Sequence, residues 1–263
     1  MSEYRNQLFP ISYYKYNIEN NEKIKNEISP LILEDSKSSP RKSPYGWLTN
    51  KIITSFEENG APVKIFGENT FFQKVVQNEY AKCFNKFFDD YYKITINDIW
   101  YSCYVDGEYQ EIHDHLGDFF HPPTLSCIHF LSFDKDRHRP VCFYDPSEQI
   151  RSTSLEFASH NYDPQVFLDI KEGDFIMFPS FLKHAVYPSP PTPDYPRITI
   201  SFNIGVSQYA EMQQQVFSGE PSNGSIKPFG LCFEGRGGAK NSMKTGEVSN
   251  LQMPGWGKKR LND

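Results

Sequence analysis

The chain has 263 residues, 16% of them aromatic, and a formal net charge of −6 at pH 7. Because nucleic acids attract proteins with an excess of positive charge, this acidic balance gives no electrostatic reason to expect a nucleic-acid partner. The length suits one large β-rich domain with extensions, and many aromatic residues combined with a hydrophilic mean hydropathy of −0.59 are typical of a sheet protein with long polar loops.

The cysteines and the N-terminal residues indicate the compartment. The chain has five scattered cysteines and no Cys-x-x-Cys pair, which favours reduced thiols in a cytosolic setting. Its first residues lack the pattern of a signal peptide, and no apolar run reaches membrane-spanning length. We therefore expect a soluble cytoplasmic protein with no membrane partner, and the sequence leaves its oligomeric state open.

The first part of the chain predicts helices after one strand. Residues 8–19 alternate enough for a strand, and a polar helix is expected over residues 20–27, ending before Pro30 because proline breaks helices. A second helix is expected over residues 70–92, where apolar residues recur at spacings of three and four and Thr70 with Gln73 forms a capping box. This apolar stripe is expected to cover one face of a sheet.

From Lys93 onward the pattern changes to short strands separated by turn residues. Apolar or alternating runs occupy residues 93–104, 109–116, 124–132, 140–144, 165–170, 174–179 and 197–206. Such strands predict a mainly β fold, an antiparallel barrel or jelly roll with the N-terminal helices packed on one sheet. Residues 1–209 are assigned to this domain, and residues 210–263, rich in Gly, Ser, Asn and Lys, are predicted to be an irregular or disordered tail.

Two histidines, His113 and His115, are the first candidate metal ligands. If this segment is extended, both imidazoles project from one face and Asp114 points the other way. A third ligand from a neighbouring strand completes a facial site with open coordination positions. His184, at the end of a later strand, is the candidate third ligand.

Arg197 opens the last alternating strand, in which Arg197, Thr199 and Ser201 share one face and Ile198 and Ile200 the other. A polar face that begins with arginine is unusual for a plain sandwich core. It is expected if the interior binds an anion, because a guanidinium binds a carboxylate through two parallel hydrogen bonds. The hydroxyl groups on the same face can add to that binding.

Several segments together resemble the 2-oxoglutarate- and Fe(II)-dependent oxygenases, and most closely a prolyl-hydroxylase-like branch common in marine phages and bacteria. The specific part is GDFIMFPSFLKHAVYPS at 173–189 followed by RITISFNI at 197–204. EYQEIHDH, TLSCIHFL and VCFYDP resemble the proximal metal motif and the strands after it, and QLFPISYYKYNI and GWLTNKI resemble the opening segments. The resemblance covers about residues 7–208.

The resemblance implies a double-stranded β-helix enzyme that uses Fe(II), 2-oxoglutarate and O2, with ascorbate as a possible reductant, to hydroxylate a C–H bond. His113 and His184 are then iron ligands, and Arg197 binds the far carboxylate of 2-oxoglutarate. Thr199, on the same polar face as Arg197, is the second candidate cosubstrate-binding residue. Most of the superfamily has His-x-Asp, whereas position 115 is histidine. His115 is the favoured second ligand; Asp114 or Asp118 bending in, or weak metal binding without catalysis, are the alternatives.

The substrate is expected to be a peptide or a small molecule, and a phage-encoded protein is expected to act in the host cytoplasm. Two other functions are considered: a non-catalytic jelly-roll binding module, and an assembly protein that acts through its sheet edges and tail. The remaining residues receive structural interpretations. His138 is expected at the surface, His129 either near the cosubstrate or packed in the core, and Trp100 and Tyr104 in the core.

Overall fold

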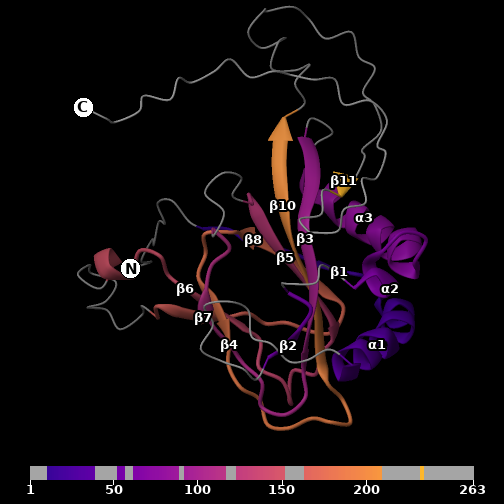
Figure 1. Cartoon of the computed structure of the whole chain (residues 1–263). Helices are drawn as coiled ribbons and strands as arrows, with labels where there is room; N and C mark the ends of the chain where they lie inside the picture. Colours follow the sequence, from indigo (N-terminus) through magenta and orange to yellow (C-terminus); the bar gives the residue numbers. More distant parts are fainter. Residues whose placement is uncertain are drawn as a thin grey trace, which may run out of the picture.

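The structure, a computed structural model, describes residues 11–38, 52–56, 62–88, 92–116, 123–151, 163–208 and 232–233. Its described strands form two sheets (Figure 1). The larger sheet has the order β1-β8-β5-β10-β3-β11, with β2 also paired to β3, and the smaller sheet has the order β4-β9-β6-β7. All described pairs are antiparallel except β11 with β3.

The larger sheet consists of β1 (Tyr14–Asn17), β2 (Ile53–Thr54), β3 (Tyr92–Tyr104), β5 (Leu125–Ser132), β8 (Asp174–Pro179), β10 (Arg197–Gln208) and β11 (Cys232–Phe233). The smaller sheet consists of β4 (Gln110–His113), β6 (Val141–Tyr144), β7 (Gln165–Phe167) and β9 (His184–Val186). The described helices are α1 (Asn21–Ser38), α2 (Val63–Phe66), the π-helical turn η1 (Phe72–Val76), α3 (Gln77–Phe87) and α4 (Glu148–Arg151).

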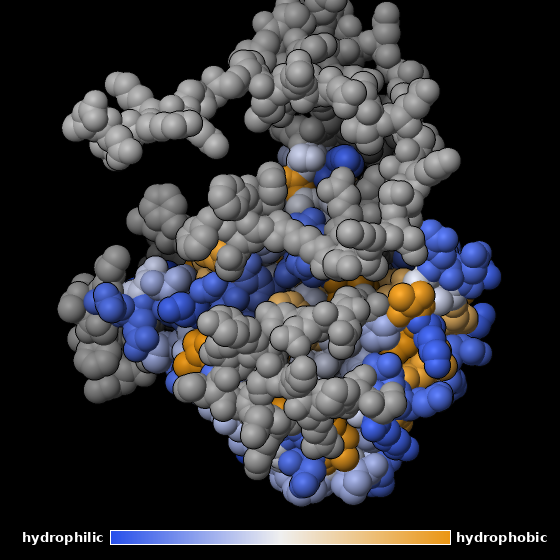
Figure 2. All heavy atoms as spheres, viewed as in Figure 1, coloured by the Kyte–Doolittle hydropathy of each residue, from blue (hydrophilic) through white to orange (hydrophobic). Residues whose placement is uncertain are grey.

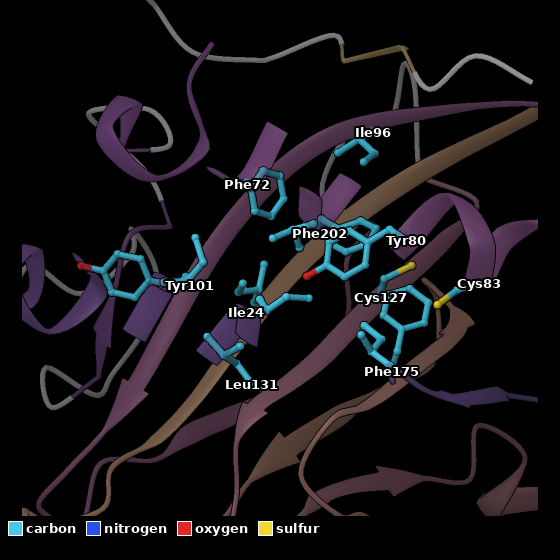
Figure 3. Packing of buried hydrophobic residues seen from close by; sticks show 14 of the residues in the cluster. Ile24, Phe72, Tyr80, Cys83, Ile96, Tyr101, Cys127, Leu131, Phe175 and Phe202 are labelled. Carbon is cyan, nitrogen blue, oxygen red and sulfur yellow. The ribbon is translucent and has the colours of Figure 1, made fainter. Parts of the chain in front are cut away.

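Helices α1, α2 and α3 lie along one face of the larger sheet (Figure 1), where the main core is formed. Tyr80 of α3 packs between Phe175 of β8 and Phe202 of β10, with ring centroids 5.3 and 5.0 Å away (Figure 3). On the view in Figure 2 the described surface over the helices is mostly hydrophilic with scattered hydrophobic residues. This is the distribution expected of amphipathic helices that bury one face. The two mainly antiparallel sheets, with helices along one of them, agree with the predicted jelly roll with helices on one sheet.

Strand β10 separates two environments through its alternation. Four apolar side chains of the strand belong to the core beneath the helices: Ile198, Ile200, Phe202 and Ile204. The intervening residues Arg197, Thr199, Ser201 and Asn203 are buried and polar, on the face directed between the two sheets. The predicted division of this strand into a polar and an apolar face is therefore confirmed.

Two helix predictions were wrong at their ends. Helix α1 does not end before Pro30 but continues to Ser38 with that proline inside it. Tertiary packing outweighs the local penalty, because Ile24, Ile28 and Ile32 are all fully buried on one side of α1. The second helix ends at Phe87, since Phe88 has an extended backbone with φ −120° and ψ 135°, and β3 already begins at Tyr92.

The expected hydrogen bonds at the start of that second helix are present in modified form. The Gln73 backbone N–H donates to Thr70 Oγ1 over 3.3 Å, as in a capping box. The return hydrogen bond runs to the Asn69 backbone N–H, which donates to Gln73 Oε1 over 2.7 Å, one residue earlier than expected. The predicted 210–263 tail lies outside the described residues except for Cys232–Phe233, which pair with Thr95 and Ile96 of β3.

Candidate functional site

The three predicted histidines come together between the sheets. His113 ends β4 and His184 begins β9, and the two residues are direct partners in the pairing of these strands. Their ring centroids are 4.2 Å apart, and the His115 ring lies 5.3 Å from His113 and 5.0 Å from His184. Nitrogen atoms of all three lie within 4.8 Å of one another. This spacing allows three imidazoles to bind one ion.

Hydrogen bonds determine which nitrogen of each ring is available. Nδ1 of His113 lies 2.7 Å from the Glu111 carbonyl oxygen, and Nδ1 of His184 lies 3.0 Å from the Leu182 carbonyl oxygen. A carbonyl only accepts, so each Nδ1 carries the hydrogen and each Nε2 keeps a lone pair. These are the tautomers that bind a metal through Nε2 while a backbone group holds the ring.

Burial keeps the three imidazoles neutral. Desolvation, followed by the nearby His113, lowers the pKa of His115 to about 4. The pKa of His184 is well below its usual value, and that of His113 is also lowered, in both cases chiefly by burial. A cluster of neutral imidazoles is the form required for metal binding, since a protonated ring has no lone pair to donate.

The alternative second ligands are placed differently. Among the described residues, the cluster able to hold a metal contains the three histidines and not Asp114. Asp114 Oδ1 instead accepts a hydrogen bond of 3.1 Å from the backbone N–H of Leu116. Asp118 lies outside the described residues.

Arg197 is a buried cation, and two of its three nitrogen atoms lack hydrogen-bond partners. The residue is 2% exposed, and its Nε and Nη1 atoms form no hydrogen bond. The guanidinium lies 4.4 Å from the Tyr104 ring centroid and 5.6 Å from that of Phe130. No ion pair found among the described residues includes Arg197. Since an unpaired buried charge is unfavourable, the arrangement fits an anionic ligand bound at this position.

A chain of contacts joins the guanidinium to the histidines. Tyr104, the strand partner of Arg197, donates from its hydroxyl to Gln110 Oε1 over 3.3 Å. The amide nitrogen of Gln110 lies 3.1 Å from Nε2 of His113. The arginine and the imidazole cluster are therefore linked through two side chains, on the polar side of the larger sheet.

Several side chains of this region were missed or misplaced from sequence. Tyr104 and Trp100 are buried as predicted, yet they contact the site: the Trp100 ring lies 5.6 Å from that of His115. The alternation of β3, combined with the pairing of Tyr104 with Arg197, was the signal that could have found them. Gln110 and Asn203 carried no signal, because their roles depend on contacts between distant segments.

Two other histidines, His138 and His129, are buried outside the imidazole cluster. The prediction that His138 lies at the surface was wrong, because it is 3% exposed and accepts a hydrogen bond of 3.0 Å from the Asp134 backbone N–H. His129 packs in the core rather than near the site, between the Tyr80 hydroxyl at 3.0 Å and Asn21 Oδ1 at 2.8 Å. Its position on the helix-covered face of β5 accounts for this.

Comparison with solved structures supports the fold. The non-heme alpha ketoglutarate dependent epimerase SnoN from nogalamycin biosynthesis matches with a TM-score of 0.52 at 10% identity, over 86% of this chain and 92% of that one. A prolyl hydroxylase from Trichoplax adhaerens matches with a TM-score of 0.49 at 14% identity, over 79% and 87% of the two chains. A Pseudomonas putida prolyl-4-hydroxylase matches with a TM-score of 0.46 at 9% identity, over 74% and 92%. The match to SnoN, together with the two mainly antiparallel sheets, supports the jelly-roll fold.

A family model identifies the class more narrowly. Residues 98–203, which contain all three histidines and Arg197, match the family described as "Putative 2OG-Fe(II) oxygenase". The match covers 106 of the 263 residues, and over this segment the chain is similar to the 2-oxoglutarate- and Fe(II)-dependent oxygenases, whose reactants are Fe(II), 2-oxoglutarate and O2. No curated protein matches the chain. None of the helices in the described part of the chain is long and apolar enough to cross a membrane.

Proposed function

We propose that the protein binds Fe(II) through His113, His115 and His184, and binds the distal carboxylate of 2-oxoglutarate through Arg197 with help from Thr199. The observation that carries this assignment is the combination of three neutral imidazoles within 4.8 Å and a buried guanidinium whose Nε and Nη1 lack partners. The first group fits a metal and the second fits an anion.

The residues of the chain prepare this site before any ligand binds. Backbone carbonyls hold the rings of His113 and His184, so these ligands lose little freedom on binding iron. Three neutral ligands leave the full charge of the ion uncompensated, which favours the dianionic cosubstrate. Tyr104 packs against the Arg197 guanidinium and excludes water from it.

When bound, iron and 2-oxoglutarate supply the oxygen-activating chemistry, in which the cosubstrate is decarboxylated to succinate and CO2. The proposed outcome is hydroxylation of a C–H bond in a peptidyl or small-molecule substrate, with ascorbate as a reductant that preserves activity. Among the structural neighbours, the Trichoplax adhaerens prolyl hydroxylase is in complex with a peptide fragment and SnoN is an epimerase. Candidate substrates therefore include peptides and small metabolites, and epimerisation is the other outcome to test.

The experiment measures metal binding and turnover in the same samples. We expect the wild-type protein to bind Fe(II) and to release succinate from 2-oxoglutarate. His184→Ala and His115→Ala should abolish metal binding, whereas Asp114→Ala should retain it, because that carboxylate faces its own turn. Metal binding without succinate release under any condition would favour a non-catalytic binding module. Loss of metal binding in Asp114→Ala alone would assign the second ligand to the carboxylate.

We further propose that residues 1–209 form the catalytic domain and that the protein is cytoplasmic, without membrane or nucleic-acid partners. A chain truncated after residue 209 should release succinate at the rate of the full chain, because His113, His115, His184 and Arg197 all precede the truncation. Lost activity of this truncation, together with unchanged activity of Arg197→Ala, would favour the assembly-protein alternative.

A further inference from the structure

Beside the imidazole cluster lies a buried group of polar side chains, which we call the Asn203 network: His115, Ser126, Ser180 and Asn203. Nδ1 of His115 lies 2.7 Å from Asn203 Oδ1 and 2.7 Å from Ser126 Oγ. Ser126 Oγ donates to Asn203 Oδ1 over 2.9 Å and lies 3.0 Å from Ser180 Oγ. The two serines are 0% and 1% exposed and Asn203 is 6% exposed, so water competes little with these hydrogen bonds.

The hydrogen atoms of this network can be assigned from its chemistry. Asn203 Oδ1 only accepts, so the hydrogen between it and His115 belongs to Nδ1. The Ser126 hydroxyl hydrogen is used toward the same oxygen, and Ser180 then donates to Ser126. The donors of His115 and Ser126 are thus both directed toward one amide oxygen. Nε2 of His115 keeps its lone pair, as in His113 and His184.

The orientation of the Asn203 amide therefore determines which nitrogen of the His115 imidazole carries the hydrogen. If the amide were turned around, its NH2 group would donate to Nδ1, and the hydrogen of the imidazole would sit on Nε2. An Nε2 that carries a hydrogen cannot bind a metal through that atom. The carbonyls that hold the other two histidines have no such second orientation, so only His115 depends on a side chain for its tautomer.

The backbone explains why Asn203 reaches this histidine. Asn203 of β10 and Ser126 of β5 are direct strand partners, which places their side chains next to each other. His115 is held from the other side, because its backbone N–H donates to the Ser180 carbonyl over 2.9 Å. Three segments distant in sequence therefore meet around one imidazole ring.

We infer that Asn203 is a positioning residue that sets His115 as the neutral Nδ1–H imidazole and so makes histidine a competent second metal ligand. This inference rests on the proposed function for the metal, but the tautomer itself is a property of the protein alone. The same role of Asn203 accounts for histidine at position 115, because the Nδ1–H of this ring donates to the acceptor oxygen of Asn203.

The test compares three variants of the full-length protein. Asn203→Leu has nearly the same size and removes the acceptor, whereas Asn203→Asp keeps an acceptor at the same place. Ser132→Ala is the matched control, because Ser132 is a buried β5 serine that donates to the Pro196 carbonyl instead. Loss of a residue that orients a metal ligand typically weakens metal binding by about 10–100-fold. We expect such a loss of Co(II) affinity in Asn203→Leu, and changes of less than about threefold in the other two.

A second measurement does not need the metal. In the metal-free wild-type protein, long-range ¹H–¹⁵N NMR spectra should show His115 as the Nδ1–H tautomer, and Asn203→Leu should shift it toward Nε2–H. An Nε2–H tautomer in wild type overturns the inference, as does an Asn203→Leu variant with unchanged tautomer and Co(II) affinity. Equal weakening in Asn203→Asp and Asn203→Leu also overturns it, because a lost acceptor would not be the cause.

These outcomes separate the inference from the proposed function. A wild-type protein that binds no Co(II) or Fe(II) but has the Nδ1–H tautomer contradicts the proposed function and leaves the role of Asn203 intact. If Asn203→Leu does not fold, two single variants, Ser126→Ala and Asn203→Asp, replace it. Each keeps a hydrogen-bond acceptor at position 203, so each should keep the Nδ1–H tautomer of His115. A changed tautomer in either variant contradicts the inference.

Discussion

Replacing Arg197 by methionine should raise the stability of the ligand-free protein and lower its affinity for 2-oxoglutarate. The side chain is 2% exposed, and two of its nitrogen atoms have no hydrogen-bond partner. Methionine keeps an apolar stem of similar length against Tyr104 and Phe130 but removes the charge. Without 2-oxoglutarate the variant should therefore be the more stable protein.

The expected magnitudes follow from the unpaired donors. A buried polar group without a partner costs about 1–3 kcal/mol, so removing two such groups should raise the free energy of unfolding by about 2–6 kcal/mol. Two charge-assisted hydrogen bonds of about 1.5–3 kcal/mol each are lost with the carboxylate, and affinity for 2-oxoglutarate should fall by at least about 100-fold.

The assay is urea unfolding of the Mn(II)-loaded protein with and without 2-oxoglutarate. At about 100 times its dissociation constant, the ligand should stabilise the wild-type protein by about 2.7 kcal/mol and the variant by almost nothing. Arg137→Met is the control, because Arg137 forms a partly exposed ion pair with Asp194 that should contribute less than about 1 kcal/mol. Equal stabilisation of wild type and Arg197→Met by 2-oxoglutarate would refute the reasoning, as would a ligand-free Arg197→Met less stable than wild type.

Three further predictions concern the stability of the fold and the reactivity of its buried thiols. Pro30→Ala should raise the free energy of unfolding by about 2 kcal/mol, since an interior helix proline costs about 3 kcal/mol and the gain is partly offset by a more flexible unfolded chain; urea midpoints check this. Burial lowers the pKa of His129 from 6.5 to about 3, so between these values the unfolded chain binds one more proton and stability falls as pH falls, by up to about 1.4 kcal/mol per pH unit. Unfolding measured from pH 6 to about 4 should give a flatter curve for His129→Gln, and an identical slope would contradict the assignment. Burial raises the pKa of Cys83 to about 12 and that of Cys127 well above its usual value, so peptide mapping should find both thiols unlabelled by iodoacetamide until denaturant is added.

Local patterns predicted the part of the site that depends on alternation along one strand. Arg197, Thr199 and Ser201 share a face because side chains alternate along β10, and this needs no knowledge of the neighbouring strands. The same reasoning placed His113 and His115 on one side of their segment. His184 was a candidate third ligand from its position after a later strand, and the family resemblance supported it; the pairing of β4 with β9 places it opposite His113.

The partners of these residues could not be predicted from the sequence. Asn203 is 88 positions from His115, and Tyr104 contacts Arg197 only because β3 pairs with β10 in one register. The burial of His138 likewise depends on a hydrogen bond to the Tyr195 carbonyl, 57 positions away. Pro30 failed as a helix end for a related reason: the isoleucines that hold α1 on the sheet contribute more than the local penalty of one proline.

The place of β10 within the larger sheet limits which parts of the protein can change in sequence during evolution. This strand is hydrogen-bonded on both sides, to β3 and to β5, and carries core isoleucines on one face and buried polar residues on the other. A slip of one residue would exchange the two faces and bury Arg197 beneath the helices. Amide hydrogen exchange of β10 should accordingly be among the slowest in the protein. New substrates are therefore more readily accommodated by changes in the connecting loops than by changes in this strand.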